Sequence, residues 1–254
     1  MASMEIDKGR FFLKDSIRQF VQFASTGQAQ HLPAPPLEKS CPADLPLVHL
    51  PSGKEALQCL AVQPLGECIA NRESIRTYSQ ESVTLAELSA LLWATQGLRQ
   101  QVSPSTALRT VPSAGARHAF ETYLTVDRVD SLQKGIYRYL PFSGQLVFLR
   151  PDEDIQVFAA TACLHQGWMS KAAVNFFWTT IPARMEWRYG LAAHKTIALD
   201  AGHVCQNLYL AGQSMGIGVC AVAAYHQEQC DMLLGLDGEE EFTIYAAATG
   251  KKQV

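Results

Sequence analysis

Arg72-Glu-Ser-Ile-Arg-Thr-Tyr78 is the most informative stretch of this chain. In an extended or turn-like backbone, residues 72, 74 and 76 point to the same side, so two guanidinium groups and a hydroxyl converge. This trio suits an anionic group such as a phosphate, because arginine offers forked, bidentate donors. The alternative is a solvated charged turn, and the segment alone does not decide between the two.

A second stretch, Pro112-Ser-Ala-Gly115, combines small residues with a hydroxyl. Such a loop lets a flat ligand approach the backbone, although an ordinary turn before a strand has the same composition. Further along, Gly212-Gln-Ser-Met-Gly216 fits the G-x-S-x-G pattern of serine hydrolases. That chemistry needs its serine on a strand-to-helix turn. Ser214 instead ends an expected helix, so a hydrolase is disfavoured.

Other common sites are also disfavoured by the sequence. His203 and Cys205 are two residues apart on an expected helix and face different sides, so no metal site is expected. No G-x-G-x-x-G follows a strand, and no G-x-x-x-x-G-K-[ST] occurs. A Rossmann dinucleotide site and a phosphate-binding P-loop are therefore not expected.

The composition describes a folded chain of one large domain or two small ones. It has 254 residues, of which 48% are hydrophobic and 18% charged. This balance excludes a disordered chain, a coiled coil and a collagen-like fibre. The net charge is -3 and the basic residues form no block, so nucleic acid is not an expected partner.

The sequence predicts a cytoplasmic protein without a membrane partner. No run of 18 apolar residues occurs, and the first twenty residues lack the pattern of a signal peptide. The seven cysteines form no C-x-x-C pair, and several lie in apolar surroundings. Free buried thiols in a reducing compartment are expected.

The N-terminal part is expected to form a helix over residues 5–25 and an extended arm over residues 32–51. Six prolines between 33 and 51 exclude a long helix or a central strand there. We interpret this stretch as an arm on the domain surface, with a flexible linker as the alternative. The boundaries are then 1–52 for the helix and arm, and 53–254 for the compact domain.

Within the compact domain the pattern of apolar residues predicts alternating groups of helices and strands. Thr84 and Glu87 match a capping box at the start of one helix, which Gly97 would end. The order lacks a strict β-α-β alternation, so the α+β class is favoured. The predicted helices cover residues 55–69, 84–97, 152–162, 196–213 and 227–234, and the predicted strands cover 122–127, 136–140, 145–149, 174–181, 218–225 and 242–248.

Four segments in this order resemble the FMN-dependent nitroreductase superfamily, and most closely its branch of azoline (thiazole/oxazole) dehydrogenases. They are 72–78, 85–97, 109–118 and 189–218, the last with Leu199-Asp-Ala-Gly-His203. The resemblance covers about residues 65–250. It implies a central, mostly antiparallel sheet flanked by helices, in an intertwined homodimer with FMN at the interface. The helix around 200–213 would then form the dimer core.

The resemblance also implies which residues hold the FMN. Arg72 and Ser74 would bind its phosphate, and Arg76 would lie near the N1/O2 edge of the flavin. Loop residues from the partner subunit would reach the ring, and a close turn would place backbone N–H groups beside N5. The remaining residues assigned in this way are Pro112, Ser113, Gly115, Gly216, Gly218, Ala223 and Ala224.

The function implied is an oxidoreductase that transfers hydride from NAD(P)H through FMN to a small electrophile, such as a nitroaromatic or a quinone. No side chain need act as a nucleophile, although Tyr189 could serve as an acid. Two alternatives stay open: an azoline dehydrogenase acting on a modified peptide, and a flavin-binding protein without turnover. The identity of the acceptor and the choice between NADH and NADPH are also open.

Three positions depart from the family pattern. Ala116 stands where many relatives carry an asparagine that bonds the flavin. Only Lys251 and Lys252 stand where relatives often have a basic tail reaching the phosphate. Arg188-Tyr189 replaces the Lys-Tyr pair that azoline dehydrogenases use as acid and base. Because an arginine stays protonated, this replacement argues against azoline oxidation.

Overall fold

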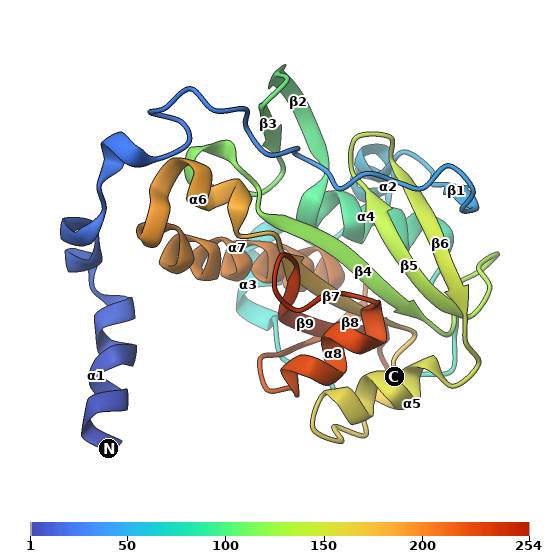
Figure 1. Ribbon diagram of the computed structural model, residues 1–254. Coiled ribbons are helices and arrows are strands. Elements are labelled where there is room, and N and C mark those ends of the chain that lie inside the picture. Colours follow the sequence, from blue (N-terminus) through green and yellow to red (C-terminus); the bar gives the residue numbers. More distant parts are fainter. Residues whose placement is uncertain (1, 254) are drawn as a thin grey trace.

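A seven-stranded antiparallel sheet forms the centre of the computed structural model, which describes residues 2–253 (Figure 1). The strand order is β1-β6-β5-β4-β7-β9-β8, and each neighbouring pair is antiparallel. The strands are β1 (Leu47–His49), β4 (Phe120–Val126), β5 (Gly135–Leu140), β6 (Gln145–Pro151), β7 (Val174–Thr180), β8 (Ile217–Val222) and β9 (Phe242–Lys251). The α+β class with an antiparallel sheet is thereby confirmed.

Helices cover both faces of this sheet. Alternate side chains of a strand point to opposite sides, so each strand contributes to two cores. Phe176 and Trp178 face a core shared with α4 and α7, whereas Phe177 faces a second core shared with α5 and α8. In Figure 1, α8 lies in front of β8 and β9, and α7 lies behind them. The helices are α1 (Ala2–Leu13), α2 (Gly53–Leu60), α3 (Leu65–Asn71), α4 (Leu85–Gln96), α5 (Ile155–Ala162), α6 (Ala183–Tyr189), α7 (Ala193–Ser214) and α8 (Gln227–Leu234).

The start of α4 has the predicted capping box. The Thr84 hydroxyl accepts a hydrogen bond from the Glu87 backbone N–H, and the Glu87 carboxylate accepts one from the Thr84 backbone N–H. These bonds satisfy donors that a helix start leaves free. The helix ends before Gly97, as the sequence predicts.

Residues 55–69 form two helices and not the single one expected. The chain leaves α2 at Ala61 and enters α3 after Pro64. Proline lacks the N–H that a continuous helix would need, and its ring clashes with the preceding turn.

Three further differences separate the structure from the expected elements. The hairpin β2 (Leu98–Ser103) and β3 (Thr106–Arg109) was not expected, nor was α6. The helix expected over residues 5–25 is interrupted: α1 ends at Leu13, and 3-10 turns follow at Asp15–Phe20 and Phe23–Ser25. Figure 1 shows α1 extending away from the sheet.

The proline-rich arm is extended, and buried arginines hold its backbone. Arg117 donates to the carbonyl of Pro35 (3.4 Å), and Arg109 to that of Leu37 (2.9 Å). Arg138 donates to the carbonyls of residues 39 (2.9 Å) and 40 (2.7 Å). Hydrogen bonds from charged donors are stronger than neutral ones, so this part of the arm is fixed on the sheet. Strand β1 then pairs with β6 at the sheet edge.

Between residues 2 and 253, no helix is long and apolar enough to cross a bilayer.

Candidate functional site

Residues 72–78, here called the arginine segment, run along the outer edge of β8. The Ile75 N–H donates to the carbonyl of Val219 (2.9 Å), and Tyr78 forms a bridge with Lys252. The segment approaches β8 closely at Gly218, where a methyl group would lie 2.6 Å from a methyl carbon of Ile75. Gly218 therefore allows the arginine segment to lie on the strand.

Arg72 and Ser74 both contact Tyr209 of α7. The Arg72 guanidinium carbon lies 5.2 Å from the centre of the Tyr209 ring, and the Ser74 and Tyr209 hydroxyl oxygens are 2.9 Å apart. The Arg76 guanidinium lies over the ring of Trp168, at 5.7 Å. Within residues 2–253, neither arginine has a carboxylate within 4 Å. The segment therefore presents two cations without acidic partners.

The end of β8 lies beside the arginine segment. The Ala221 N–H is bound to the Tyr209 hydroxyl oxygen (2.8 Å). Ala223 and Ala224 follow the strand and are exposed, and in the described part of the chain their N–H groups have no hydrogen-bond acceptor. Gly216, in the turn before β8, has a φ of +73°, a conformation that favours glycine.

The last strand brings a third cation to the same end of α7. The Lys252 ammonium donates to the side-chain oxygen of Gln213 (2.8 Å), and the Gln213 amide donates in turn to Gln63 (3.2 Å). Gln213 follows Tyr209 by one helical turn, so the two side chains share a face of α7. Lys252 therefore lies on the side of the helix that carries the arginine segment.

Pro112–Gly115, here called the Pro-Ser loop, lies against the other end of α7. The Ala114 N–H donates to the carboxylate of Asp200 (3.2 Å), and the Ser113 hydroxyl oxygen accepts from the His118 N–H (3.0 Å). Burial raises the pKa of Asp200, and hydrogen bonds from Ser113 and Ala114 oppose that rise. Pro112 itself is exposed. These bonds tie the loop to the helix.

Arg188 and Tyr189 lie directly beside the Pro-Ser loop. Gly115 has a φ of +60°, and a methyl group there would lie 2.6 Å from the Tyr189 hydroxyl and 2.9 Å from the Arg188 side chain. Only glycine leaves room for both side chains and also adopts this backbone conformation without strain. The Tyr189 hydroxyl is thereby held against the loop.

The structure thus brings the sequence-predicted residues together in two groups. Arg72, Ser74 and the end of β8 meet around Tyr209, whereas Ser113, Gly115 and Tyr189 gather near Asp200. Tyr209 lies nine positions after Asp200 on α7, which corresponds to about 14 Å along the helix axis. Within one chain, the two groups therefore lie at different positions along α7.

An exposed helix face connects the two groups. Residues 198, 199, 202, 203 and 206 of α7 are exposed at helical spacing, and Leu199 keeps 56% of its surface exposed. Small residues make up part of this face, including Ala198 and Gly202. A large exposed leucine beside small residues is typical of a contact surface.

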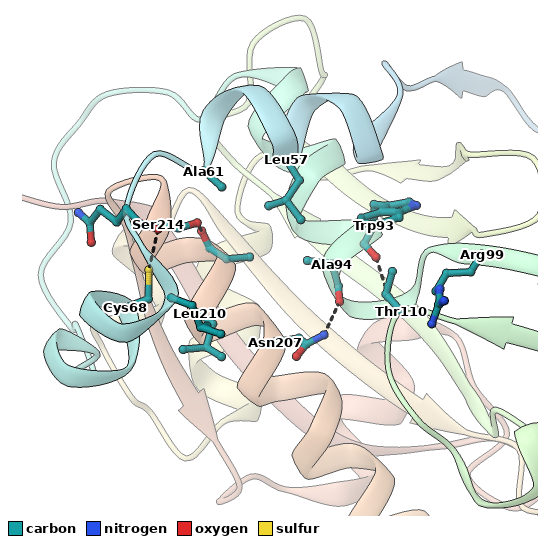
Figure 2. A pocket seen from close by; sticks show the side chains of 13 residues that line it. Leu57, Ala61, Cys68, Trp93, Ala94, Arg99, Thr110, Asn207, Leu210 and Ser214 are labelled. Atoms are coloured by element: carbon teal, nitrogen blue, oxygen red, sulfur yellow. Dashed lines mark hydrogen bonds between the residues drawn. The ribbon is translucent and has the colours of Figure 1, made fainter.

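A groove of about 500 Å³ lies at the end of α7 near the first group (Figure 2). The Asn207 amide spans its floor by donating to the carbonyl of Ala94 (2.9 Å), and the Thr110 hydroxyl donates to Trp93 (2.8 Å). No residue of the arginine segment lines it. The lining is largely apolar and consists of Leu57, Ala61, Gln63, Leu65, Cys68, Trp93, Ala94, Arg99, Thr110, Asn207, Leu210, Ala211 and Ser214.

Other chemical sites find no support in the geometry. Ser214 is buried at the end of α7, and its hydroxyl donates to the Ala211 carbonyl (2.8 Å), so it is not the exposed nucleophile of a hydrolase. Over the described residues, no group of three or more His, Cys, Asp or Glu side chains could hold a metal ion.

Tyr209 is the central residue that sequence reasoning missed. It belongs to an apolar run of α7 and resembles a core residue there. Its contacts join three segments that are distant in the sequence, so no local pattern marks it. The role of Gln213 as the partner of Lys252 was missed for the same reason.

Comparisons with known proteins agree on one family. The model of the family described as "Nitroreductase family" matches residues 69–251. The chain is 30% identical over 188 residues to "Putative nitroreductase MJ1384" of Methanocaldococcus jannaschii, which covers 74% of this chain and 91% of that protein.

Three solved structures share the fold. A "putative nitroreductase" from Ralstonia eutropha superposes with a TM-score of 0.68 at 22% identity, over 88% of this chain and all of the other. One from Anabaena variabilis gives 0.66 at 23% identity, over 85% of this chain but only 45% of that one. The Escherichia coli microcin synthetase McbBCD complex gives 0.60 at 17% identity, over 73% of each chain.

Proposed function

Because this chain belongs to the nitroreductase family, we propose that it is an FMN-dependent enzyme that passes hydride from NAD(P)H to a small nitroaromatic or quinone acceptor. The family makes the chain an oxidoreductase. The cofactor, the donor and the acceptor belong to the proposal. The observation that carries it is the arginine segment, in which Arg72 and Arg76 flank Ser74 in sequence and have no carboxylate partner among residues 2–253.

The arginine segment fits the phosphate of FMN. Arg72, Ser74 and Arg76 offer charged and neutral donors, and no carboxylate of the described chain neutralises the two guanidiniums. Lys252 adds a third cation from the last strand. A phosphate accepts hydrogen bonds through several oxygens, so a group of donors of this kind matches it. Lys252 would thus replace the basic tail of other family members.

The N–H groups of Ala223 and Ala224, which have no acceptor among residues 2–253, suit the edge of a flavin ring. The charge of Arg76 reaches β8, where it acts against the burial that raises the pKa of the Cys220 thiol. FMN, when bound, supplies reversible two-electron transfer between a nicotinamide and an acceptor. The residues of this chain would bind it, orient it and exclude water from its ring.

We infer that the working unit is a homodimer. Within one chain, about 14 Å of α7 separates the Pro-Ser loop from Tyr209, where the arginine segment meets the helix. A two-fold axis across the exposed face of α7 would set two such helices antiparallel. Ser113 and Gly115 of one copy would then approach the Tyr209 end of the other. The same contact would cover Leu199 and the neighbouring groove.

The first test is the absorbance spectrum of the purified protein, followed by addition of NADH and then NADPH without oxygen. The proposal expects a flavin band near 450 nm, extractable as FMN and bleached by one of the two donors. A colourless protein that cannot be reconstituted with FMN would overturn it. The cytoplasmic location remains a prediction that cell fractionation would check.

One observation favours a second function, the oxidation of azolines in a modified peptide. Tyr189 lies against the Pro-Ser loop, and the chain shares its fold with a protein of the microcin synthetase complex. This function predicts a bound flavin that neither nicotinamide bleaches, turnover with oxygen, and loss of activity in Tyr189→Phe. Rapid bleaching by NADH or NADPH, with Tyr189→Phe still active, would exclude it.

A further inference from the structure

Tyr209 joins three elements through one hydroxyl and one ring. It lies on α7 with 9% of its surface exposed. Its hydroxyl oxygen accepts from the Ala221 N–H of β8 at 2.8 Å and lies 2.9 Å from the Ser74 hydroxyl. The face of its ring lies under the Arg72 guanidinium, at 5.2 Å.

The direction of these hydrogen bonds follows from counting protons. The Tyr209 oxygen already accepts from Ala221, and its own proton is free to be donated to Ser74. If Ser74 accepts that proton, its hydroxyl hydrogen must point elsewhere. A phosphate has only acceptor oxygens at neutral pH, so it binds Ser74 only through that hydrogen. An anion therefore selects one direction, from Ala221 through Tyr209 and Ser74 to the ligand.

A neighbouring thiol lies within reach of both hydroxyls of this chain. Cys220 lies beside Ser74 and Tyr209, and its sulfur donates to the Ala221 carbonyl at 3.6 Å. Burial raises the pKa of Cys220, so it remains a neutral thiol and not a competing anion at neutral pH. Hydrogen bonds from Ser74 and Tyr209 act against that rise, so the sulfur is a second acceptor for the Ser74 hydrogen. A phosphate is the stronger acceptor, because hydrogen bonds to a charged group are stronger than those to a neutral thiol, so a bound anion draws this hydrogen to itself.

The ring of Tyr209 holds the Arg72 guanidinium, the second group that would donate hydrogen bonds to the phosphate. Arginine is attracted to the face of an aromatic ring, and the attraction increases where water is excluded. Arg72 is half-buried and has no carboxylate partner within residues 2–253, so the ring is what fixes its guanidinium. One buried side chain thus sets the position of a charged donor and a neutral donor.

We propose that Tyr209 is a positioning residue that orients Ser74 and Arg72 toward the phosphate of the cofactor. This inference rests on the proposed function, because it takes FMN as the ligand of the arginine segment. It concerns contacts with the phosphate and not with the flavin ring, so a comparison of FMN binding with riboflavin binding tests it. Riboflavin carries the same ring and ribityl chain without the phosphate.

The experiment measures the dissociation constants of FMN and riboflavin from the apoprotein by quenching of flavin fluorescence. Tyr209→Phe keeps the ring and removes the hydroxyl, so FMN should bind about tenfold more weakly, equivalent to about 1.4 kcal/mol. Tyr209→Leu also removes the ring and should weaken FMN about a hundredfold, or about 2.7 kcal/mol. Riboflavin binding should change less than threefold in both variants.

Tyr137→Phe is the matched control. The Tyr137 hydroxyl is also bonded to a backbone group, the Gln133 carbonyl at 2.7 Å, but lies on β5 away from the arginine segment. This variant should bind FMN as the wild type does. Circular dichroism and thermal unfolding establish that each variant is folded before its flavin constants are compared.

A double-mutant cycle tests whether Tyr209 acts through Ser74. Ser74→Ala should weaken FMN about tenfold, and adding Tyr209→Phe should weaken it no further, because the hydroxyl to be oriented is already gone. The inference would be overturned if the losses of FMN affinity in the two single variants multiplied in the double variant. It would also be overturned if Tyr209→Phe weakened FMN and riboflavin equally. If the wild type binds FMN and Tyr209→Phe binds it equally well, the inference alone fails. If the wild type binds no FMN, the proposed function fails with it.

Discussion

Lys251 and Lys252 are neighbours at the end of β9, and their ammonium groups go to different partners. Lys251 pairs with the buried carboxylate of Glu87, whereas Lys252 donates to the side-chain oxygen of Gln213. Side chains of adjacent strand residues point to opposite faces, so the two lysines cannot share a role. The Lys251 charge is neutralised by Glu87 of the α4 capping box, whereas the Lys252 ammonium has no carboxylate partner among residues 2–253.

Lys252→Gln is expected to weaken FMN binding about tenfold, or about 1.4 kcal/mol, because it removes a cation from the phosphate site. Riboflavin binding should stay as in the wild type. Lys251→Gln is the control, and it should lower the unfolding temperature by leaving Glu87 unpaired while FMN binding is retained. Flavin titration and thermal unfolding of both variants check this, and equal flavin affinities for the two would contradict it.

Gly115→Ala is expected to destabilise the fold more than Gly144→Ala. Both glycines have a similar backbone, with φ of +60° and +65°, but a methyl group meets Tyr189 at the first and open space at the second. The shared strain costs about 1 kcal/mol, and the clash adds about 1 to 3 kcal/mol at Gly115. Urea unfolding measures the difference.

Tyr189→Phe should reduce the destabilisation caused by Gly115→Ala, because it removes the hydroxyl that the added methyl group meets. The loss of unfolding free energy in the double variant should then be smaller than the sum of the two single losses. Additive losses would mean that the two residues do not meet in solution.

Stability should fall on acidification because of His118. Burial, with help from the charge of Arg109, lowers the pKa of His118 to about 3 from its usual 6.5. Between these values the unfolded chain takes up a proton that the folded chain does not, so this contribution is present above pH 6.5 and lost as the pH falls toward 3. From pH 7 to pH 5 the loss is about 2 kcal/mol.

Between pH 7 and pH 5, the free energy of unfolding of His118→Asn should fall by about 2 kcal/mol less than that of the wild type. Asparagine accepts the left-handed backbone of this position, where φ is +46°. Urea unfolding at pH 7 and pH 5 gives the comparison. Parallel losses in the two proteins would show that His118 takes up its proton in the folded state as well.

Leu199→Glu is expected to convert a dimer into a monomer and to release FMN, because the charge falls on the exposed face of α7. Val157→Glu on α5 is the control, since Val157 is as exposed (55%) as Leu199 (56%). Sedimentation velocity gives the oligomeric state of each variant, and its absorbance gives the bound FMN. A wild-type protein that is monomeric and still retains FMN would refute the proposal that two copies of the chain form the FMN site together.

The sequence predicted elements where apolar spacing and end signals agree. The helix over 227–234 has the predicted bounds, and α4 begins at its capping box and ends at Gly97. The hairpin at 98–109 was missed because β2 carries Arg99, Gln100 and Gln101 on an exposed surface without alternation. A strand stabilised mainly by its partner leaves no local pattern.

The site was predicted less completely than the fold. The residue types of Arg72, Ser74 and Arg76 indicate an anion site, but not that Ser74 is bonded to Tyr209 or that Arg76 lies on Trp168. Those contacts depend on how α7, β8 and the loop before β7 pack together. Equally, the separation of the Pro-Ser loop from the arginine segment becomes visible only once α7 is placed between them.

The arm bound by buried arginines has a consequence for the order in which this chain folds. Residues 35–40 are synthesised early, but the guanidiniums that bind their carbonyls belong to Arg109, Arg117 and Arg138. The arm therefore has no partner until the middle of the sheet has left the ribosome. We expect it to stay protease-sensitive on shorter nascent chains and to become protected only after β5 is complete. An arm that is made early is thus among the last segments to be secured.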